Sequence, residues 1–324
     1  MNFSSILIDW QKESGRNGLP WQGSNDPYRI WVSEIMLQQT QVATVIPYYE
    51  RFLSSFPDLE SLAEAEIDEV LSLWSGLGYY SRARNLHETA KLIRKSGRFP
   101  DNPEALAGLP GIGRSTAAAI CAFSFGTRAA ILDGNVKRVF CRHFGMEGYP
   151  GEKKVEIRMW EQAEALLPER EVGRYTQALM DLGATLCTRR NPDCARCPLS
   201  ESCIAHLEGR VEELPCPRPK KALPSRRTAF LLMEREGRLL FERRPEKGVW
   251  AGLLCFPEAD PSQYAESEKL LSFVHTFTHF RLEIEAVRVP ADREGIWLAA
   301  EEALSSPIPV PVRKILEKIR APFP

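Results

Sequence analysis

The spacing of apolar residues divides the chain into a helical part and a later part with short strands. From residue 27 to about residue 209, apolar residues recur at intervals of three and four, the period of helices that bury one face. Asp26-Pro27 and Asp101-Asn102-Pro103 have the capping residue and the proline that are typical of helix starts. The pattern therefore predicts a mostly helical first domain over residues 1–209.

After residue 209 the pattern changes to short apolar runs and alternation. Strands are predicted at 228–233, at 239–243 after a Glu236-Gly237 turn, and at 281–287, with a closing helix near 312–319. These elements predict an α/β domain over residues 228–324. Residues 210–227 contain four prolines and six basic residues against two acidic ones, which predicts a stiff, basic linker.

Composition adds the class of protein and its compartment. The 324 residues are 44% hydrophobic and 26% charged, as in a globular protein of about two domains. The N-terminus has no basic region followed by an apolar core, and no apolar run is long enough to span a bilayer. We expect a cytoplasmic protein, associated with the nucleoid if it is bacterial, with no membrane partner. The net charge of -1 means that any affinity for nucleic acid must come from local basic patches.

Four of the eight cysteines are grouped with the spacing of metal ligands. Cys187, Cys194, Cys197 and Cys203 follow the pattern C-x6-C-x2-C-x5-C. Grouped thiolates select iron-sulfur clusters or zinc, and a reducing compartment argues against disulfides. Four-cysteine zinc sites more often pair two C-x2-C units, and only one is present here. An iron-sulfur cluster is the favoured interpretation; zinc and chance clustering of reduced cysteines are the alternatives.

A glycine-rich turn, Leu109-Pro110-Gly111-Ile112-Gly113, separates a short helical stretch at 103–107 from an alanine-rich helix predicted at 115–123. Glycines let the backbone approach an anion, and a helix N-terminus offers unpaired amide groups. Without a βαβ context the pattern favours a helix-hairpin-helix that grips phosphate over a dinucleotide fold. A plain tight turn between two helices is an equal alternative.

Two carboxyl groups are candidates for acid-base chemistry. Glu34 falls on the apolar face of a predicted helix, together with Ile30, Trp31 and Leu37. Burial there would raise its pKa from about 4.3 and make it a proton donor near neutral pH; a hydrogen-bonded core acid is an equal alternative. Asp133 precedes another predicted helix, where Asp is most often an N-cap, although a cap can also present its carboxylate to a ligand.

Six motifs, in order and nearly end to end, resemble the MutY family of adenine-specific DNA glycosylases in the helix-hairpin-helix superfamily. They are Leu19-Pro20-Trp21-Gln22, residues 31–42, residues 76–85, residues 109–117, residues 132–139 and the cysteine quartet. Residues 248–257 and 277–279 resemble the Nudix-like C-terminal domain of the same family. The resemblance implies a two-lobed, mostly α helix-hairpin-helix glycosylase domain followed by an α/β Nudix-like domain.

The same resemblance implies excision of adenine mispaired with 8-oxoguanine or guanine, a step of base excision repair, and a [4Fe-4S] cluster on the four cysteines. Such an enzyme flips the adenine out of the duplex before the chemistry. Glu34 would protonate N7 of the adenine and then assist water, and Asp133 would stabilise the oxocarbenium sugar. Asn135 would help to hold the site, and Trp21 would line the adenine pocket.

Further roles follow from the same motifs. Gln39, Leu77 and Tyr79 would fill or wedge the duplex around the partner base, with ordinary core packing as the alternative. Ser115 stands where the related endonuclease III-like lyases place the lysine that forms a Schiff base. Without that amine, the resemblance implies a monofunctional glycosylase that leaves an abasic site.

The Nudix-like domain is expected to recognise and not to hydrolyse. Nudix hydrolases hold magnesium on a glutamate-rich helix, and Glu266, Glu268 and Lys269 do not reproduce that spacing. Thr278 and His279 would instead read 8-oxoguanine on the opposite strand. The family often has serine at the position of Thr278, so this chain keeps the hydroxyl and adds a methyl group.

The partner implied is double-stranded DNA with A:8-oxoguanine or A:G mispairs, bound by a monomer. Gly111 and Gly113 would contact phosphate in the hairpin, and the arginines inside the cysteine loop would dock on phosphate, with the cluster folding that basic loop as a staple. These arginines are Arg189, Arg190 and Arg196. Two alternatives remain open: a non-catalytic iron-sulfur module that binds DNA lesions, and a bifunctional endonuclease III-like glycosylase and lyase.

Overall fold

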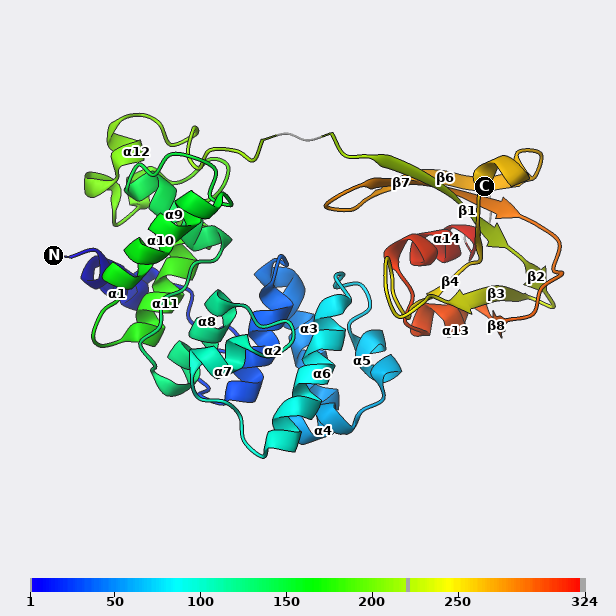
Figure 1. Cartoon of the computed structure of the whole chain (residues 1–324), viewed down its shortest axis with the longest axis horizontal. Helices are drawn as coiled ribbons and strands as arrows, with labels where there is room; N and C mark the ends of the chain where they lie inside the picture. Colours follow the sequence, from blue (N-terminus) through cyan, green and yellow to red (C-terminus); the bar gives the residue numbers. More distant parts are fainter. Residues whose placement is uncertain (1, 220–221, 321–324) are drawn as a thin grey trace. The chain divides into compact units, whose positions relative to one another are not determined.

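The computed structural model describes residues 2–219 and 222–320, which form two compact units (Figure 1). The first unit comprises residues 1–64 and 85–220, and the second comprises residues 65–84 and 221–324. Residues 220 and 221 of the predicted linker and residues 321–324 of the predicted C-terminal domain lie outside the described residues.

The first unit is helical, as the period of its apolar residues predicts. Its helices are α1 (Phe3–Ser14), α2 (Pro27–Leu37), α3 (Val42–Ser55), α4 (Leu59–Glu64), α6 (Ser81–Ser96, whose first turn falls in the second unit), α7 (Pro103–Ala107), α8 (Arg114–Phe125), α9 (Gly134–His143), α10 (Lys153–Ala165), α11 (Val172–Asp181) and α12 (Ile204–Leu207). A π-helical turn, η1 (Leu182–Leu186), continues α11, and two 3-10 turns follow, η2 (Cys194–Arg196) and η3 (Ser200–Ser202).

Helix starts coincide with the predicted caps. Asp26 accepts a hydrogen bond from the Tyr28 amide at 2.9 Å, and Asn102 accepts one from the Ala105 amide at 2.9 Å. In each case the side-chain oxygen satisfies an amide that has no partner inside the helix, and proline occupies the first helical position.

One core of the first unit is built by α1 and by α8 to α11. Leu7, Phe140, Met159 and Leu179 are among its buried members, all with exposed fractions of 1% or less. Helix α1 packs against α11, and α2 packs against α8. The start of the predicted linker also joins this core, because Leu214 is buried and the Arg142 guanidinium donates a hydrogen bond to its carbonyl at 2.8 Å.

The second unit contains α5 (Ile67–Leu73) and an α/β arrangement built on two small sheets. The first sheet has the order β5 (Glu258–Ala259), β1 (Ser225–Leu232), β7 (Arg281–Arg288), β6 (Glu268–Thr276), with β1 and β7 parallel and the other pairs antiparallel. The second sheet joins β2 (Glu234–Arg235), β3 (Arg238–Arg243) and β4 (Leu254–Cys255), and β8 (Ile296–Leu298) also pairs with β3. The 3-10 turn η4 (Pro261–Tyr264) and the helices α13 (Ala300–Ser305) and α14 (Val310–Arg320) complete it.

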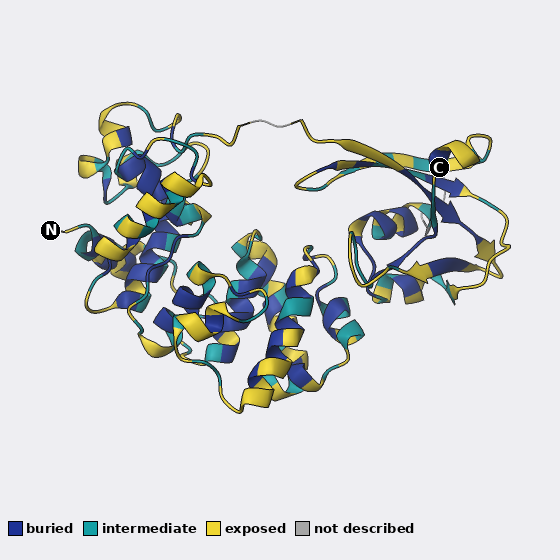
Figure 2. Cartoon of the chain, in the orientation of Figure 1, coloured by how far each residue is buried: buried dark blue, intermediate teal, exposed yellow. Residues whose placement is uncertain are grey.

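The faces of these strands follow their sequence patterns. From Arg281 to Ala286 of β7, buried positions alternate with exposed or intermediate ones, which matches the alternation that predicted this strand. Figure 2 colours the whole chain by burial. Strand β6 was not predicted. Its register with β7 shifts between Lys269 and Leu271, and this irregularity interrupts the alternation by which a strand is recognised in sequence.

Candidate active site and iron-sulfur site

A cavity of about 620 Å³ lies in the first unit, within the size range of small-molecule sites. Its wall is formed by the loop after α1, by α2 and by α11. Residues on that wall include Arg16, Asn17, Leu19, Trp21, Gln22, Ile30, Ser33, Glu34, Leu37, Val42, Gln177 and Met180. The structure therefore brings Trp21 and Glu34, both predicted as site residues, to one cavity.

Glu34 lies on α2 at the wall of this cavity, where it is partly exposed. Ile30 and Leu37, one turn away on either side, line the same cavity. Burial and, after it, the negative charge of Asp133 together raise the pKa of Glu34 to about 8. Glu34 is therefore protonated at neutral pH, which is the state that a general acid requires.

Asp133 is the N-cap of α9, as its position in the sequence predicts. Its Oδ1 accepts a hydrogen bond from the Val136 amide at 2.8 Å, and its Oδ2 accepts one from the Asn135 side-chain amide at 3.4 Å. Burial raises the pKa of Asp133, while these hydrogen bonds and the charge of Arg138 oppose the rise because they favour the carboxylate. The two acids are close enough for the charge of Asp133 to act on Glu34.

Three contacts fix the position of Asp133. The Ser115 hydroxyl, in the first turn of α8, accepts a hydrogen bond from the Leu132 amide at 2.9 Å. The Arg138 guanidinium donates to Asn135 Oδ1 at 2.9 Å and to the Cys187 carbonyl at 2.7 Å. Arg138 thus connects the cap of α9 with the start of the cysteine loop.

Gly183 allows η1 to approach α9 closely. A Cβ atom on Gly183 would lie 2.5 Å from the Cβ of Asn135 and 3.1 Å from its Cα. Because Cβ atoms do not approach one another that closely, only glycine fits without moving one of the two helical segments. Gly183 therefore helps to set the position of the segment that carries Asp133.

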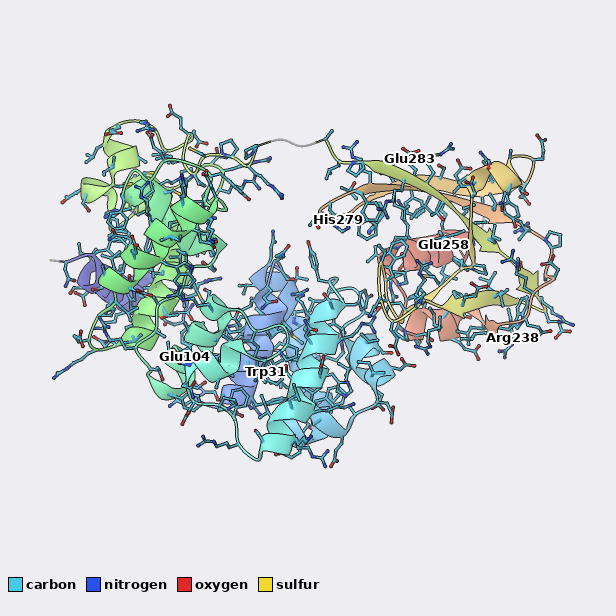
Figure 3. The ribbon with its side chains drawn as sticks, in the orientation of Figure 1. Trp31, Glu104, Arg238, Glu258, His279 and Glu283 are labelled. Atoms are coloured by element: carbon cyan, nitrogen blue, oxygen red, sulfur yellow. The ribbon has the colours of Figure 1, made fainter. Side chains whose placement is uncertain are left out.

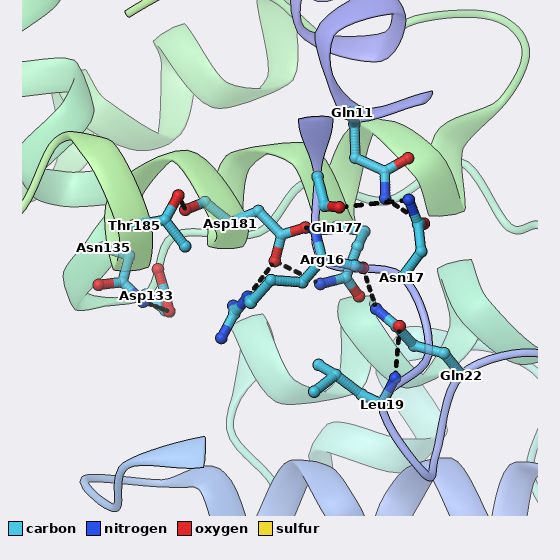
Figure 4. A network of polar contacts seen from close by, with 11 residues as sticks. Gln11, Arg16, Asn17, Leu19, Gln22, Asp133, Asn135, Gln177, Asp181 and Thr185 are labelled. Atoms are coloured by element: carbon cyan, nitrogen blue, oxygen red, sulfur yellow. Dashed lines mark hydrogen bonds and ion pairs between the residues drawn. The ribbon is translucent and has the colours of Figure 1, made fainter. Parts of the chain in front are cut away.

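Polar contacts tie the loop after α1 to α11, and Figure 4 draws them from close by. Asp181 has no exposed surface and accepts hydrogen bonds from the Arg16 amide at 2.9 Å, from Arg16 Nε at 2.8 Å and from Gln177 Nε2 at 2.8 Å. Gln22 bonds the Leu19 amide at 3.0 Å and the Arg16 carbonyl at 2.9 Å. Sequence reasoning missed this network, which shapes one wall of the cavity.

The predicted helix-hairpin-helix is formed by α7, the turn at residues 108–113 and α8. Gly111 has φ of 77°, in the left-handed region that favours glycine, and a Cβ there would lie 2.8 Å from Asn85 Cβ. Residues outside the turn donate hydrogen bonds to its carbonyl groups. The Thr89 hydroxyl donates to the Pro110 carbonyl at 3.0 Å, and the Gln38 side-chain amide donates to the Gly111 carbonyl at 3.3 Å. Gly113 caps α8 without a side chain, which leaves amide groups at the helix start.

The four grouped cysteines line one small cavity, with Arg142 beside them. None of the four forms a disulfide, and Arg142 Nη1 donates a hydrogen bond to Cys187 Sγ at 3.4 Å. In the described residues no three His, Cys, Asp or Glu side chains are close enough to hold a single metal ion. Four sulfurs around a shared space, with a cation against one of them, fit an iron-sulfur cluster held by four thiolates.

Arg142 is the residue that organises this loop, and sequence reasoning missed it. Arg142 is 2% exposed, and its side chain donates to one carbonyl inside the quartet, that of Thr188 at 2.6 Å, and to one after it, that of Val211 at 3.0 Å. Arg189, Arg190 and Arg196 are all exposed, but Arg196 lies 3.6 Å from Asp193, the cap of η2.

The three residues predicted to wedge the duplex differ in exposure. Gln39 is exposed with φ of 58°, and Tyr79 is 47% exposed with φ of 50°. Leu77 is 6% exposed, so the packing alternative describes it better in this structure. Gln39 belongs to the first unit and the other two belong to the second.

Thr278 and His279 are both exposed at the tip of the hairpin between β6 and β7, where Figure 3 labels His279. The tip is rigid: the Phe277 amide donates to the Phe280 carbonyl at 2.9 Å, and the two rings stack with centroids 4.4 Å apart. Between β5 and β6, where a Nudix hydrolase would need its metal-binding helix, the described residues form only the four-residue turn η4.

Comparisons with known proteins agree with this architecture. The profile of HhH-GPD superfamily base excision DNA repair proteins matches residues 32–165, that of the iron-sulfur binding domain of endonuclease III matches residues 187–203, and that of the NUDIX domain matches residues 228–318. A solved thermostable thymine-DNA glycosylase is 31% identical with a TM-score of 0.58, over 64% of this chain and 95% of its own. An endonuclease III-DNA complex, 20% identical over 64% of this chain and 94% of its own, has a TM-score of 0.54 and shows the fold alone.

The class defined by fold and site is therefore a helix-hairpin-helix DNA glycosylase with an iron-sulfur site and a Nudix-like domain, as the six motifs predicted. The adenine DNA glycosylase of Buchnera aphidicola from Acyrthosiphon pisum is 38% identical, over 98% of this chain and 97% of its own. The human adenine DNA glycosylase is 31% identical, over 97% of this chain and 73% of its own. The chain belongs to the adenine DNA glycosylase family.

Within residues 2–219 and 222–320, no helix is both long and apolar enough to cross a membrane.

The raised pKa of Glu34 predicts how the free energy of unfolding depends on pH. The pKa of Glu34 is about 8 in the folded protein against 4.5 for an ordinary glutamate, so the folded state holds the proton more tightly and loses stability as pH rises between these values. Glu34→Gln removes the ionisation and should stabilise the protein by an amount that grows from pH 5 to pH 8, reaching about 4 kcal/mol. Denaturant unfolding across this pH range measures the difference. Glu60→Gln, at an exposed position of α4, is the control; a constant difference for Glu34→Gln would contradict the raised pKa.

Proposed function

We propose that this protein removes adenine mispaired with 8-oxoguanine or guanine in double-stranded DNA, as a monomer, and leaves an abasic site without cutting the strand. The observation that carries the proposal is Glu34, protonated near neutral pH inside a cavity and within electrostatic range of Asp133. The family to which the chain belongs supports adenine as the base.

The chemistry follows from the two acids. The flipped adenine enters the cavity, where Glu34 transfers its proton to N7 of the base. The bond between N9 and the sugar C1′ then breaks, and its electron pair leaves with the adenine. The positive charge left on the sugar is stabilised by the Asp133 carboxylate, which the contacts from Val136 and Asn135 hold in place. Water adds to C1′ and returns a proton to Glu34.

The cavity wall supports a base as the ligand. Trp21 is 8% exposed, and its ring meets that of Tyr49 edge to face with centroids 5.3 Å apart, which fixes the indole as a flat apolar wall. Gln177 and Gln22, also on the wall, carry amide groups that can both donate and accept hydrogen bonds to the edge of a purine.

The proposal of a monofunctional enzyme rests on the lack of an amine. The described lining of the cavity includes no lysine, and Ser115, which replaces the lysine of the related lyases, is engaged with the Leu132 amide. A Schiff base needs a nucleophilic amine at the sugar C1′. Water is then the nucleophile, and the strand stays intact.

The cysteine quartet would hold the cluster as a structural element. The four cysteines would bind its iron as thiolates, and this would fix the loops between them. Arg138 and Arg142, both on α9, link these loops to that helix. Arg189 and Arg190 are exposed and can bind the phosphate backbone of DNA. The amide groups at Gly111 and Gly113 supply a second phosphate contact at the start of α8.

The central experiment uses a duplex with adenine opposite 8-oxoguanine. We expect strand breaks only after alkali treatment, and a single-turnover rate that falls as pH rises above about 8, where Glu34 loses its proton. Glu34→Gln should lower the rate by a factor of 100 or more while duplex binding persists, with Glu60→Gln as control. Breaks without alkali, together with a complex trapped by borohydride, would identify a lyase; duplex binding with no excision would leave the non-catalytic alternative.

A second prediction concerns the opposite base. Thr278→Ala and His279→Ala should each lower the ratio of excision opposite 8-oxoguanine to excision opposite guanine, by about tenfold. The rate opposite guanine should change little, because the hairpin tip lies outside the cavity that holds the chemistry. Ser272→Ala, at an exposed position of β6, serves as the control. An unchanged ratio in both variants would exclude this hairpin as the reader of 8-oxoguanine.

A third prediction distinguishes the arginines of the cysteine loop by their contribution to DNA binding. Arg189→Ala and Arg190→Ala should weaken binding to any duplex and reduce the salt dependence by about one released ion each, without loss of the visible absorbance of the cluster. Arg196→Ala should have a smaller effect because Asp193 partly neutralises that side chain. Equal salt slopes for the wild type and the first two variants would remove this loop from the DNA interface.

A further inference from the structure

The second unit contains an unexpected segment. Residues 65–84, which precede most of the helical domain in sequence, belong to the same compact unit as the C-terminal sheets. This segment carries α5 and the turn at residues 74–80, in which Tyr79 stands exposed. Side chains from β3 and α14, together with the loop before α14, bind the segment at separate points.

The first point is a paired contact between Arg243 on β3 and Asp68 in the first turn of α5. Arg243 Nη1 lies 3.0 Å from Asp68 Oδ1, and Nη2 lies 2.8 Å from Oδ2, so the guanidinium engages both carboxylate oxygens. Arg243 Nη1 also donates to the Gly252 carbonyl at 3.0 Å. A two-pronged arrangement of this kind fixes orientation as well as distance.

The second point lies at the turn itself. The buried Tyr80 hydroxyl donates to the Ile308 carbonyl at 2.9 Å. Arg313, on α14, donates to the Ser75 hydroxyl at 3.1 Å and to the Leu304 carbonyl at 2.9 Å. Residues near both ends of the turn are thus bound to α14 and to the loop before it.

The third point is a close approach of backbone to side chain. A Cβ on Gly252, which has φ of 67°, would lie 2.7 Å from Arg84 Nη1. The left-handed backbone favours glycine at position 252, and the Arg84 guanidinium packs against it. The loop before β4 is shaped to receive the end of the segment.

The turn that these contacts hold is itself rigid. Gly76 and Gly78 have φ of 97° and 75°, and Tyr79 adopts φ of 50°, a conformation that is unfavourable for a tyrosine unless the surroundings enforce it. Trp74 Nε1 donates to the Gly78 carbonyl at 3.1 Å, and Arg82 donates to the Leu77 and Gly78 carbonyls at 3.2 and 3.1 Å. The carbonyls of the turn are hydrogen-bonded, and both of its ends are held by the C-terminal domain. The ring of Tyr79 is the exposed tip of this turn.

We propose that the C-terminal domain positions the turn at residues 74–80, so that Arg243, Arg313 and the Ile308 carbonyl set the orientation in which Tyr79 enters the duplex. The inference rests on the proposed function, in which a base is extruded from DNA. The domain then contributes to extrusion at any mispair, in addition to reading the base opposite adenine. Arg243 and Arg313 are positioning residues, since they act through the turn and do not touch the reacting atoms.

Charge reversal tests the contact with Asp68. Full-length Arg243→Glu and Asp68→Arg, and the double variant, are compared on a duplex with adenine opposite guanine, which offers no 8-oxoguanine contact. The fluorescence of 2-aminopurine placed beside the adenine reports extrusion. Each single variant should slow extrusion about fivefold or more, and the double variant should recover to within about twofold, because it restores the ion pair with opposite polarity. Arg288→Glu, which breaks the exposed pair with Glu268 at 3.4 Å in the same domain, should leave the rate unchanged.

Tyr80→Phe provides a second test that keeps the fold, because it removes only the hydroxyl bound to Ile308. It too should slow extrusion while the unfolding temperature changes little. The inference is overturned if the wild type excises adenine and the single reversals and Tyr80→Phe extrude at the wild-type rate, or if the double reversal gives no recovery. A wild type that excises nothing opposite 8-oxoguanine contradicts the proposed function instead, so the two failures are distinguishable.

Discussion

The structure of the candidate site depends on keeping one proton on one buried carboxyl group. Glu34 holds its proton near neutral pH because burial disfavours its charged form and because Asp133 places a second negative charge nearby. Asp133 in turn keeps its place through the cap of α9, the Ser115 contact and the hydrogen bond from Asn135. The hydrogen bonds to Asp133 and the charge of Arg138 favour its carboxylate, whereas burial and the charge of Asp133 both raise the pKa of Glu34.

Local signals in the sequence predicted the elements well. Asp26, Asn102 and Asp133 cap the helices that they were expected to start, and the Glu236-Gly237 turn joins β2 to β3 with both residues at positive φ. Helix caps and tight turns depend on residues that are neighbours in the sequence, so they can be predicted without knowledge of the fold. Strand β6 could not be read in this way, because its register shift interrupts the alternation.

The site was predictable where a motif carried it and unpredictable where the contact was long-range. Glu34 and Trp21 were placed by motif, and the cavity brings them together. Arg16 and Asp181 are 165 positions apart in the sequence. A single ion pair between such distant residues produces no repeating pattern from which it could be predicted. Arg142 and the contacts of the segment at residues 65–84 were missed for the same reason. Exposure of Gln39, Leu77 and Tyr79 also depends on packing that no local pattern encodes.

Gly183 has a consequence for how sequence changes in this family should be interpreted. It bears no functional group and is not part of the described wall of the cavity that holds Glu34, yet the distance between η1 and α9 is set by the hydrogen atom that replaces its side chain. A single added methyl group would push on Asn135 and so shift the acid two residues before it. An enzyme of this kind can therefore be silenced by a substitution that leaves every chemically active side chain in place.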